Sequence, residues 1–265
     1  MIAKHFGWTT DPFDREIPVD SLVSFQAHSE VTARLLFAAE HRQLALVTGD
    51  TGMGKTTAVR AAMHRLDNAH YRPIYVASAG LTSQTLVRIL LEKLHIEPRF
   101  RYTENHALVQ QALEDSYAAG QQVVVVIDEA HDLSPILLGQ LRVLLNFRTD
   151  SFSPMSLWLV GQTELRETLR LRVLAPLSQR IEMRYAMTPM TTEELSFYMA
   201  EQLRRVGEER MIFASDAILQ IAKLSRGVPR VVNSICKAAL LNAVMQSEQV
   251  VGLPNVESAW LEVNG

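Results

Sequence analysis

One stretch of the sequence carries the residue types that bind a chain of phosphates. It reads G-x-x-x-x-G-K-T with a second threonine behind it, and its residues are Gly49, Asp50, Thr51, Gly52, Met53, Gly54, Lys55, Thr56 and Thr57. Glycines let successive main-chain N–H groups converge on an anion, and a helix N-terminus behind them adds partial positive charge. In this motif the lysine reaches the β- and γ-phosphates, and the first threonine hydroxyl ligates Mg²⁺. The segment predicts a site for a nucleoside triphosphate with Mg²⁺.

Two carboxylates follow the longest apolar run. Residues 122–128 read as a strand buried on both faces, which delivers Asp128 and Glu129 to its carboxyl end. We expect Asp128 to hold Mg²⁺ through water, and Glu129 to orient and deprotonate the attacking water. His131 could be a third catalytic group or a metal ligand. Because no second histidine lies at ligand spacing, a structural or supporting role for His131 is favoured.

The elements that must position these residues alternate between strands and helices, which predicts an α/β fold with a central parallel sheet flanked by helices. Gln162 follows one of the strands and is placed to contact the γ-phosphate or the attacking water. The predicted strands are 44–48, 73–77, 122–128, 156–160 and, as an edge or final strand, 181–187.

The chain after about residue 190 reads as helices alone, which predicts a small helical domain. We therefore expect an N-terminal segment at 1–28 that packs on the ATPase domain, an α/β phosphate-loop ATPase domain at 29–189, and a helical lid at 190–265. Phe6, Trp8 and Phe13 could flank a nucleotide base or pack in the core. Core packing is the favoured of these two interpretations.

Composition excludes several classes of protein. Of 265 residues, 48% are hydrophobic and 21% charged, as in ordinary soluble domains. The net charge of −3 does not indicate a nucleic-acid partner, so such a contact needs a local patch. A single cysteine, Cys236, excludes an intramolecular disulfide. No segment resembles a signal peptide or a membrane span, and we expect a cytoplasmic protein without a membrane partner.

One loop interleaves cations with aromatic rings. Arg99 and Arg101 alternate with Phe100 and Tyr102, and Thr103 follows. On a DNA-binding protein, Arg99, Arg101, Tyr102 and Thr103 would contact the phosphate backbone. The alternative, a solvated loop whose aromatic rings tuck inward, is slightly favoured by the sequence.

The motifs together resemble the AAA+ ATPases, and within them the ExeA-like group, which includes secretion ATPases and the TnsC-like helpers of transposons. The resemblance covers nearly the whole chain and is closest to the TnsC-like helpers. Besides the phosphate loop it rests on His5–Gly7 with Pro12–Phe13, Asp128–His131, Leu159–Gln162 with Glu164–Leu165, and Ser225–Arg230.

The resemblance implies further roles. It makes Gln162 the sensor at the strand tip, Arg180 the arginine finger that reaches a neighbouring subunit's γ-phosphate, and Arg230 a second sensor in the same subunit. Arg170 and Arg172 compete with Arg180, which could also be a surface ion-pair residue. Many AAA+ proteins carry asparagine or threonine where Gln162 stands, so hydrolysis is expected to be slow or to depend on a partner.

These inferences favour an ATPase that cleaves ATP to ADP and phosphate with Mg²⁺ when assembled as a ring or filament. The leading hypothesis is a regulator of DNA transposition that assembles on double-stranded DNA and recruits or activates a transposase, with a target-selection protein as a further candidate partner. It rests on the resemblance and on the expectation that the chain stops at Gly265 without the membrane span and cell-wall-binding domain of secretion ATPases. Secretion or envelope assembly through protein partners is the alternative, and a signalling or defence switch is a third.

Overall fold

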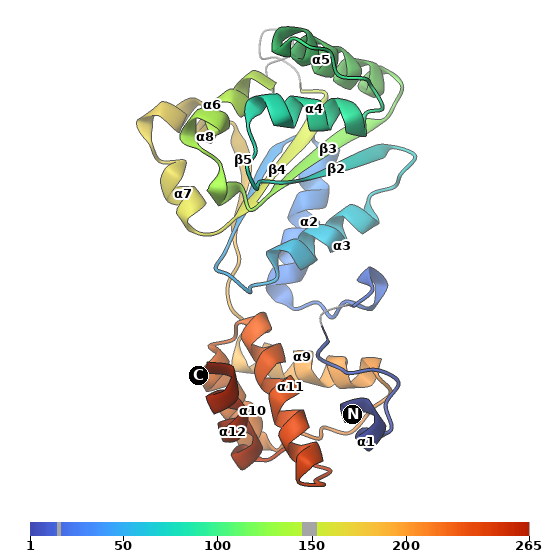
Figure 1. Ribbon diagram of the computed structural model, residues 1–265, viewed down its shortest axis with the longest axis vertical. Coiled ribbons are helices and arrows are strands. Elements are labelled where there is room, and N and C mark those ends of the chain that lie inside the picture. Colours follow the sequence, from blue (N-terminus) through green and yellow to red (C-terminus); the bar gives the residue numbers. More distant parts are fainter. Residues whose placement is uncertain (15–16, 145–152, 265) are drawn as a thin grey trace. The chain divides into compact units, whose positions relative to one another are not determined.

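The computed structural model describes residues 1–14, 17–144 and 153–264 (Figure 1). They form two compact units. The α/β unit comprises Glu30–Thr51 and Lys55–Met187, and the helical unit comprises Met1–Ser29, Gly52–Gly54 and Thr188–Gly265.

A five-stranded sheet in the order β2-β3-β4-β1-β5 forms the centre of the α/β unit, and every pairing in it is parallel. This confirms the predicted fold class, with β5 at an edge. The strands are β1 (Leu44–Thr48), β2 (Tyr71–Ala77), β3 (Gln122–Asp128), β4 (Met155–Gly161) and β5 (Ile181–Ala186).

The run of β-branched residues in β3 explains its inner position. Val125 pairs with Ile74 of β2 on one side and with Leu157 of β4 on the other. Every residue from Val123 to Asp128 is buried, because helices cover both faces of the sheet. The strand therefore ends with the Asp128 carboxylate already below the protein surface.

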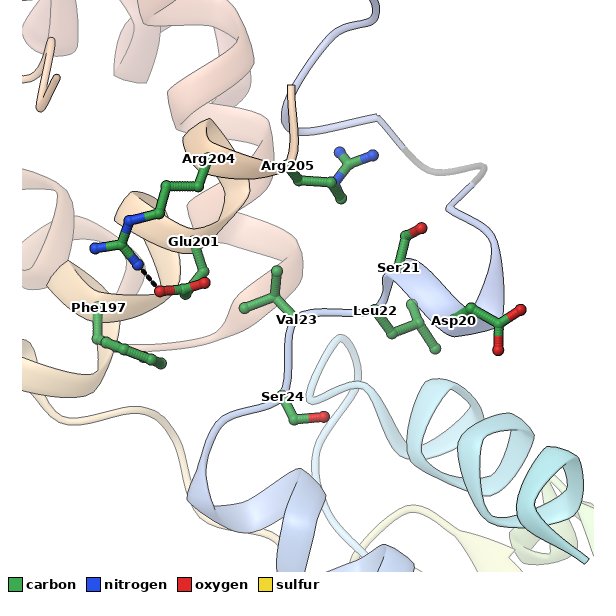
Figure 2. A pocket seen from close by; sticks show the side chains of 9 residues that line it. All are labelled: Asp20, Ser21, Leu22, Val23, Ser24, Phe197, Glu201, Arg204 and Arg205. Atoms are coloured by element: carbon green, nitrogen blue, oxygen red, sulfur yellow. Dashed lines mark ion pairs between the residues drawn. The ribbon is translucent and has the colours of Figure 1, made fainter. Parts of the chain in front are cut away.

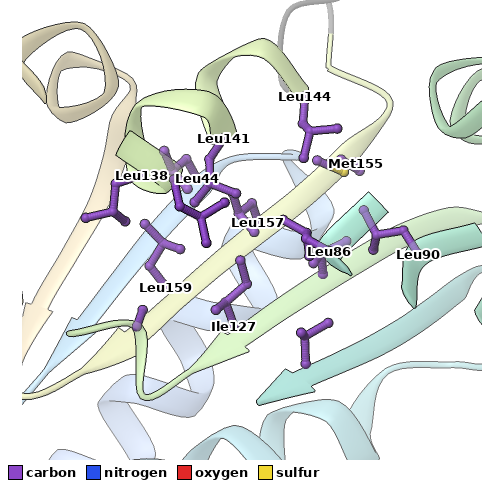
Figure 3. Close-up of a cluster of buried hydrophobic side chains, with 14 of the residues drawn as sticks. Leu44, Leu86, Leu90, Ile127, Leu138, Leu141, Leu144, Met155, Leu157 and Leu159 are labelled. Atoms are coloured by element: carbon purple, nitrogen blue, oxygen red, sulfur yellow. The ribbon is translucent and has the colours of Figure 1, made fainter. Parts of the chain in front are cut away.

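The helices that connect the strands form two layers, one on each face of the sheet. Leucines of α6, with Leu86 and Leu90 of α4, pack on alternate strand residues of one face (Figure 3). The intervening strand residues point to the opposite face, where buried side chains of α2 and α3 supply the second layer. The helices are α2 (Gln26–Glu40), α3 (Lys55–Arg65), α4 (Ser83–Lys93), α5 (Tyr102–Ala118), α6 (Pro135–Leu144), α7 (Glu164–Thr168) and α8 (Ala175–Gln179), with the 3₁₀ turns η2 (Ala130–Asp132) and η4 (Arg172–Leu174).

The helical unit joins the N-terminal segment to the C-terminal helices. Its elements are α1 (Ile2–Phe6), the 3₁₀ turn η1 (Val19–Ser21), α9 (Thr192–Arg205), α10 (Ser215–Ser225), α11 (Pro229–Met245) and α12 (Leu253–Asn264). A capping box between Thr191 and Glu194 starts α9, as helix N-termini favour.

The N-terminal segment groups with the C-terminal helices rather than with the α/β unit, against which we expected it to pack. The Trp8 indole N–H donates to the Glu208 carboxylate at 3.3 Å, and the Phe13 ring meets Phe213 edge-on with centroids 6.0 Å apart. Phe6 stacks on Trp8. Trp8 and Phe13 are buried, as core packing predicts, whereas Phe6 is half-buried.

Gly227 precedes α11 in a conformation that only glycine adopts easily. Its φ is +73°, and a Cβ there would lie 2.1 Å from the carbonyl oxygen of Met190. The Met190 N–H also donates to the Gly227 carbonyl at 3.0 Å. The start of α11 is thereby fixed to the segment that enters α9.

Alanine at Gly227 should destabilise the helical unit through this clash. Gly207 is the matched control, since its φ is +88° but no atom lies within 4 Å of its would-be Cβ. We expect Gly207→Ala to lower the free energy of unfolding by about 1 kcal/mol and Gly227→Ala by roughly 3 kcal/mol or more. Urea unfolding followed by far-ultraviolet circular dichroism measures both, and equal losses would contradict the clash.

Candidate functional site

The phosphate loop links the end of β1 to the start of α3. Gly52 and Gly54 have φ values of +85° and +83°, which lets the main chain turn sharply between the strand and the helix. The Lys55 side chain is buried, and its ammonium donates to the carbonyl oxygens of Gly49 at 2.7 Å and Asp50 at 3.0 Å. The lysine is thus held in the loop it is predicted to serve.

Asp128 lies at the carboxyl end of β3 and is only 2% exposed. The Thr56 hydroxyl donates to its Oδ2 at 2.8 Å, and the N–H of Glu129 donates to its Oδ1 at 2.9 Å. Threonine and carboxylate oxygens are the hard ligands that Mg²⁺ accepts. The two predicted metal-holding residues are therefore in contact, and their donor atoms fit the ion.

Two polar residues near these carboxylates escaped the sequence analysis. The Tyr75 hydroxyl donates to Asp128 Oδ2 at 2.8 Å, and burial together with that carboxylate raises the pKa of Tyr75. The Ser78 hydroxyl donates to the Glu129 carbonyl at 2.8 Å. Both come from β2 and its end, and only the strand register places them beside β3.

Glu129 has an exposed carboxylate on a constrained backbone. Its φ is +53°, in the left-handed region that residues other than glycine seldom adopt. The side chain is 52% exposed and lies with its Oε2 3.4 Å from Nδ1 of His131. The carboxylate is therefore accessible to solvent at the carboxyl end of β3.

Gln162 follows β4 and is in contact with the phosphate loop. The Thr51 hydroxyl donates to its Oε1 at 3.0 Å, and its Nε2 lies 2.8 Å from Nε2 of His131. Thr163 reinforces the connection by donating to Asp50 at 3.1 Å. Because β4 lies between β1 and β3, Gln162 bridges the loop and the residues after Asp128.

Comparison with known proteins agrees with this geometry. Residues 38–169, which span the phosphate loop, Asp128, Glu129 and Gln162, match the family model described as AAA domain. The chain carries an AAA+ ATPase domain.

Relatives of the whole chain extend the likeness. General secretion pathway protein A of Aeromonas hydrophila is 30% identical over 272 residues, which cover 100% of this chain and 49% of that protein. The chain thus spans about half the length of this relative.

Two solved structures share the fold of the AAA+ domain and the helical unit. Cdc6p from Pyrobaculum aerophilum has a TM-score of 0.76 at 16% identity, covering 97% of this chain and 72% of that one. The Orc1 protein of Aeropyrum pernix, in a complex with DNA, has a TM-score of 0.65 at 19% identity, covering 92% and 67%.

The candidate arginine fingers lie on the segment from the end of α7 to the end of α8. Arg180 ends α8 and donates to the carbonyl oxygen of Arg142 in α6 at 3.4 Å, whereas Arg170 and Arg172 are exposed between α7 and α8. Elements α6, η4 and α8 pack together, and three large apolar side chains on them and beside them are exposed. We call this the arginine face; its members are Arg170, Arg172 and Arg180 with Ile136, Leu171 and Val173.

Arg230 lies in the first turn of α11, where its side chain is exposed. Its N–H donates to the carbonyl oxygen of Gly52 at 3.2 Å, and both residues belong to the helical unit. The role of Arg230 as a second sensor stays a prediction.

The loop of Arg99 to Thr103 is held in place by Asn105. The buried Asn105 side chain accepts from the Arg99 N–H at 2.6 Å and donates to the Arg99 carbonyl at 3.0 Å. Phe100 is 98% exposed, so the inward-facing alternative is wrong for this ring. Tyr102 and Thr103 belong to the first turn of α5, which starts earlier than the loop pattern suggested.

A separate hollow of about 480 Å³ lies in the helical unit (Figure 2). Its charged side chains from α9 are engaged there: Arg204 pairs with Glu201, and Arg205 donates to Gln202 and to the Pro12 carbonyl. The residues that line it are Asp20, Ser21, Leu22, Val23, Ser24, Phe197, Glu201, Arg204 and Arg205. It contains none of the predicted site residues.

In the part of the chain that the structure describes, no helix has the length and apolar character needed to cross a membrane.

His28 packs against the tip of the phosphate loop. A Cβ at Gly54 would lie 2.2 Å from Nε2 of His28, so this histidine occupies the space beside the glycine. Burial lowers the pKa of His28 to about 4, and a hydrogen bond to the Met53 main chain opposes that shift. The folded state therefore contains neutral His28 at physiological pH.

His28 makes stability depend on pH. Its pKa falls from 6.5 to about 4 on folding, so between these values the unfolded chain binds the proton more tightly. The free energy of unfolding should fall by about 3 kcal/mol as the pH drops through this window. In His28→Gln that part of the pH dependence should vanish, whereas the exposed His41→Gln should keep it. Chemical denaturation across the window measures the difference, and an unchanged slope in His28→Gln would refute this assignment.

Proposed function

We propose that the protein binds and hydrolyses ATP with Mg²⁺ in an assembly of its own subunits, and that this assembly forms on double-stranded DNA to regulate transposition. The observation that supports the ATPase part is the convergence of the phosphate loop, Asp128, Glu129 and Gln162 at one edge of the sheet. The transposase that it recruits or activates, and a target-selection protein, are the proposed partners.

The proposed reaction divides among residues of this chain. The loop N–H groups and Lys55 bind the phosphates, while Thr56 and Asp128 would hold Mg²⁺, which would supply positive charge to the phosphate oxygens. Glu129 accepts a proton from the attacking water, and Gln162 orients that water or the γ-phosphate. Arg230 is the proposed second sensor of the same subunit.

The arginine face supports a reaction shared between subunits. A phosphoryl group in transfer spreads negative charge over its oxygens, and a guanidinium supplied by a neighbour is worth about 10³-fold or more in rate. Ile136 and Val173 on this face are 75% and 69% exposed, which favours contact with another surface. We assign the finger to Arg180, with Arg170 and Arg172 as competitors.

The loop from Arg99 to Thr103, which Asn105 holds in place, supports the proposed DNA contact. Arg99 and Arg101 flank the exposed Phe100, and the two Asn105 hydrogen bonds fix the main chain that presents them. We assign Arg99, Arg101, Tyr102 and Thr103 to the phosphate backbone, since arginines and helix N-termini make such contacts. Repetition along an assembly multiplies a small contribution per subunit and offsets the net charge of −3.

A second candidate function is an ATPase that supports secretion or envelope assembly through protein partners. The 30% identity to General secretion pathway protein A, along the whole of this chain, favours it. Both candidates use the same ATP site, so DNA dependence separates them.

Mixed assemblies test whether the site is completed by a neighbour. Arg180→Ala should lower turnover about 10³-fold, and Glu129→Gln should bind ATP without hydrolysing it. A one-to-one mixture should regain about a quarter of wild-type turnover, the share of random contacts that join an intact finger to an intact base. Steady-state phosphate release measures this. A mixture as inactive as its components would exclude Arg180 as a finger acting between subunits, and Arg170→Ala and Arg172→Ala mixtures serve as controls.

Sedimentation with a slowly hydrolysed ATP analogue, with and without duplex DNA, tests the DNA assignment. We expect assembly that depends on DNA and weakens as salt rises. Arg99→Ala or Arg101→Ala should reduce the slope of log K against log salt by about one, because each removes a phosphate contact. Arg60→Ala, an exposed arginine of α3, is the control. Assembly that does not depend on DNA at any salt concentration would contradict the transposition proposal and favour the secretion candidate.

A further inference from the structure

His131 lies between the predicted base and the predicted sensor of the AAA+ domain. It belongs to η2, two residues after Glu129, and its side chain is only 16% exposed. A Cβ at Gly161 would lie 3.0 Å from the His131 N atom and 3.4 Å from Nδ1, so the histidine packs closely against the end of β4. This packing fixes where the imidazole can be.

The hydrogen bonds around the ring form a directed series. The Thr51 hydroxyl donates to Gln162 Oε1 at 3.0 Å, which leaves the Gln162 amide N–H to donate to Nε2 of His131 at 2.8 Å. A neutral ring that accepts at Nε2 carries its proton on Nδ1. Nδ1 is the atom that faces Glu129 Oε2 at 3.4 Å.

The same atoms also allow the opposite pattern. The Gln162 main-chain N–H can donate to Nδ1 at 3.4 Å, which requires the ring proton to be on Nε2. Nε2 then faces the Gln162 side chain, which must present its oxygen, and Asp132 at 3.6 Å. Only the first pattern gives Glu129 an N–H partner.

We propose that His131 is a positioning residue that couples Gln162 to Glu129, through the tautomer that the orientation of the Gln162 amide selects. With the proton on Nδ1 the ring holds the Glu129 carboxylate, and with the proton on Nε2 the carboxylate is released to accept a proton from water. A carboxylate that already accepts an N–H bond is the weaker acceptor for that proton. This regulation rests on the proposed ATP hydrolysis at the same site.

Nitrogen-15 NMR of histidine-labelled protein reads the tautomer directly. We expect His131 of the wild type, near neutral pH and without nucleotide, to carry its proton on Nδ1. Gln162→Ala should move the ring toward Nε2–H, and the His131→Asn spectrum assigns the signal. A wild-type ring already protonated at Nε2, or a tautomer that Gln162→Ala leaves unchanged, would overturn the coupling.

Two amide substitutions separate the two ends of the ring. His131→Asn keeps an N–H near Glu129 but loses Nε2, and His131→Gln keeps a group near Gln162 but loses Nδ1. His131→Asn, which keeps an N–H on Glu129, should lower kcat about tenfold with KM for ATP unchanged, whereas His131→Gln, which frees the carboxylate, should not lower kcat. Gln162→Ala should cost more kcat in the His131→Asn background than in the wild type, because the tautomer shift that frees Glu129 cannot occur there. Additive losses would contradict the coupling. His64→Asn, an exposed histidine of α3, should change neither value.

The two proposals fail in different ways. A wild type that hydrolyses no ATP, alone or with DNA, would remove the proposed function, and the NMR comparison would still decide whether Gln162 sets the His131 tautomer. A wild type that hydrolyses ATP, with a tautomer indifferent to Gln162, would remove this inference alone.

Discussion

The candidate site depends on how the buried Asp128 carboxylate is stabilised. A carboxylate removed from water is costly unless donors surround it, and here hydroxyls of Thr56 and Tyr75 and the N–H of Glu129 supply them. These donors come from the first turn of α3, from β2 and from the residue after β3. Hydrogen bonds to the Asp128 carboxylate therefore join the first turn of α3, strand β2 and the main chain of Glu129.

Charge in this protein acts through placement rather than amount. Although the net charge is −3, two surfaces of the protein carry several arginines, and in each of them exposed apolar side chains occur close to the arginines along the chain. Arg170, Arg172 and Arg180 lie on short helices after β4, whereas Arg99 and Arg101 lie between α4 and α5. The two surfaces thus lie on different connections between strands of the same sheet.

The sequence predicted what depends on local pattern. Three patterns led to the fold class and to the residues of the candidate site. They are the glycine spacing, the β-branched run that ends at Asp128, and Gln162 after an apolar strand. It missed Tyr75 and Ser78 because their importance comes from the pairing of β2 with β3, which no local pattern specifies. It also did not predict the contacts of residues 1–28 with the C-terminal helices, since aromatic side chains such as Trp8 and Phe13 indicate burial without saying in which core.

The hydrogen bond from Met190 to Gly227 limits the freedom of the main chain that precedes it. Upstream, the Met187 N–H donates to Thr48 at 2.7 Å and so belongs to the sheet, whereas Met190 is fastened to the start of α11. Only Thr188 and Pro189 lie between these two attachments, and the proline ring locks its own φ. At this connection, torsional freedom is confined to a handful of single bonds.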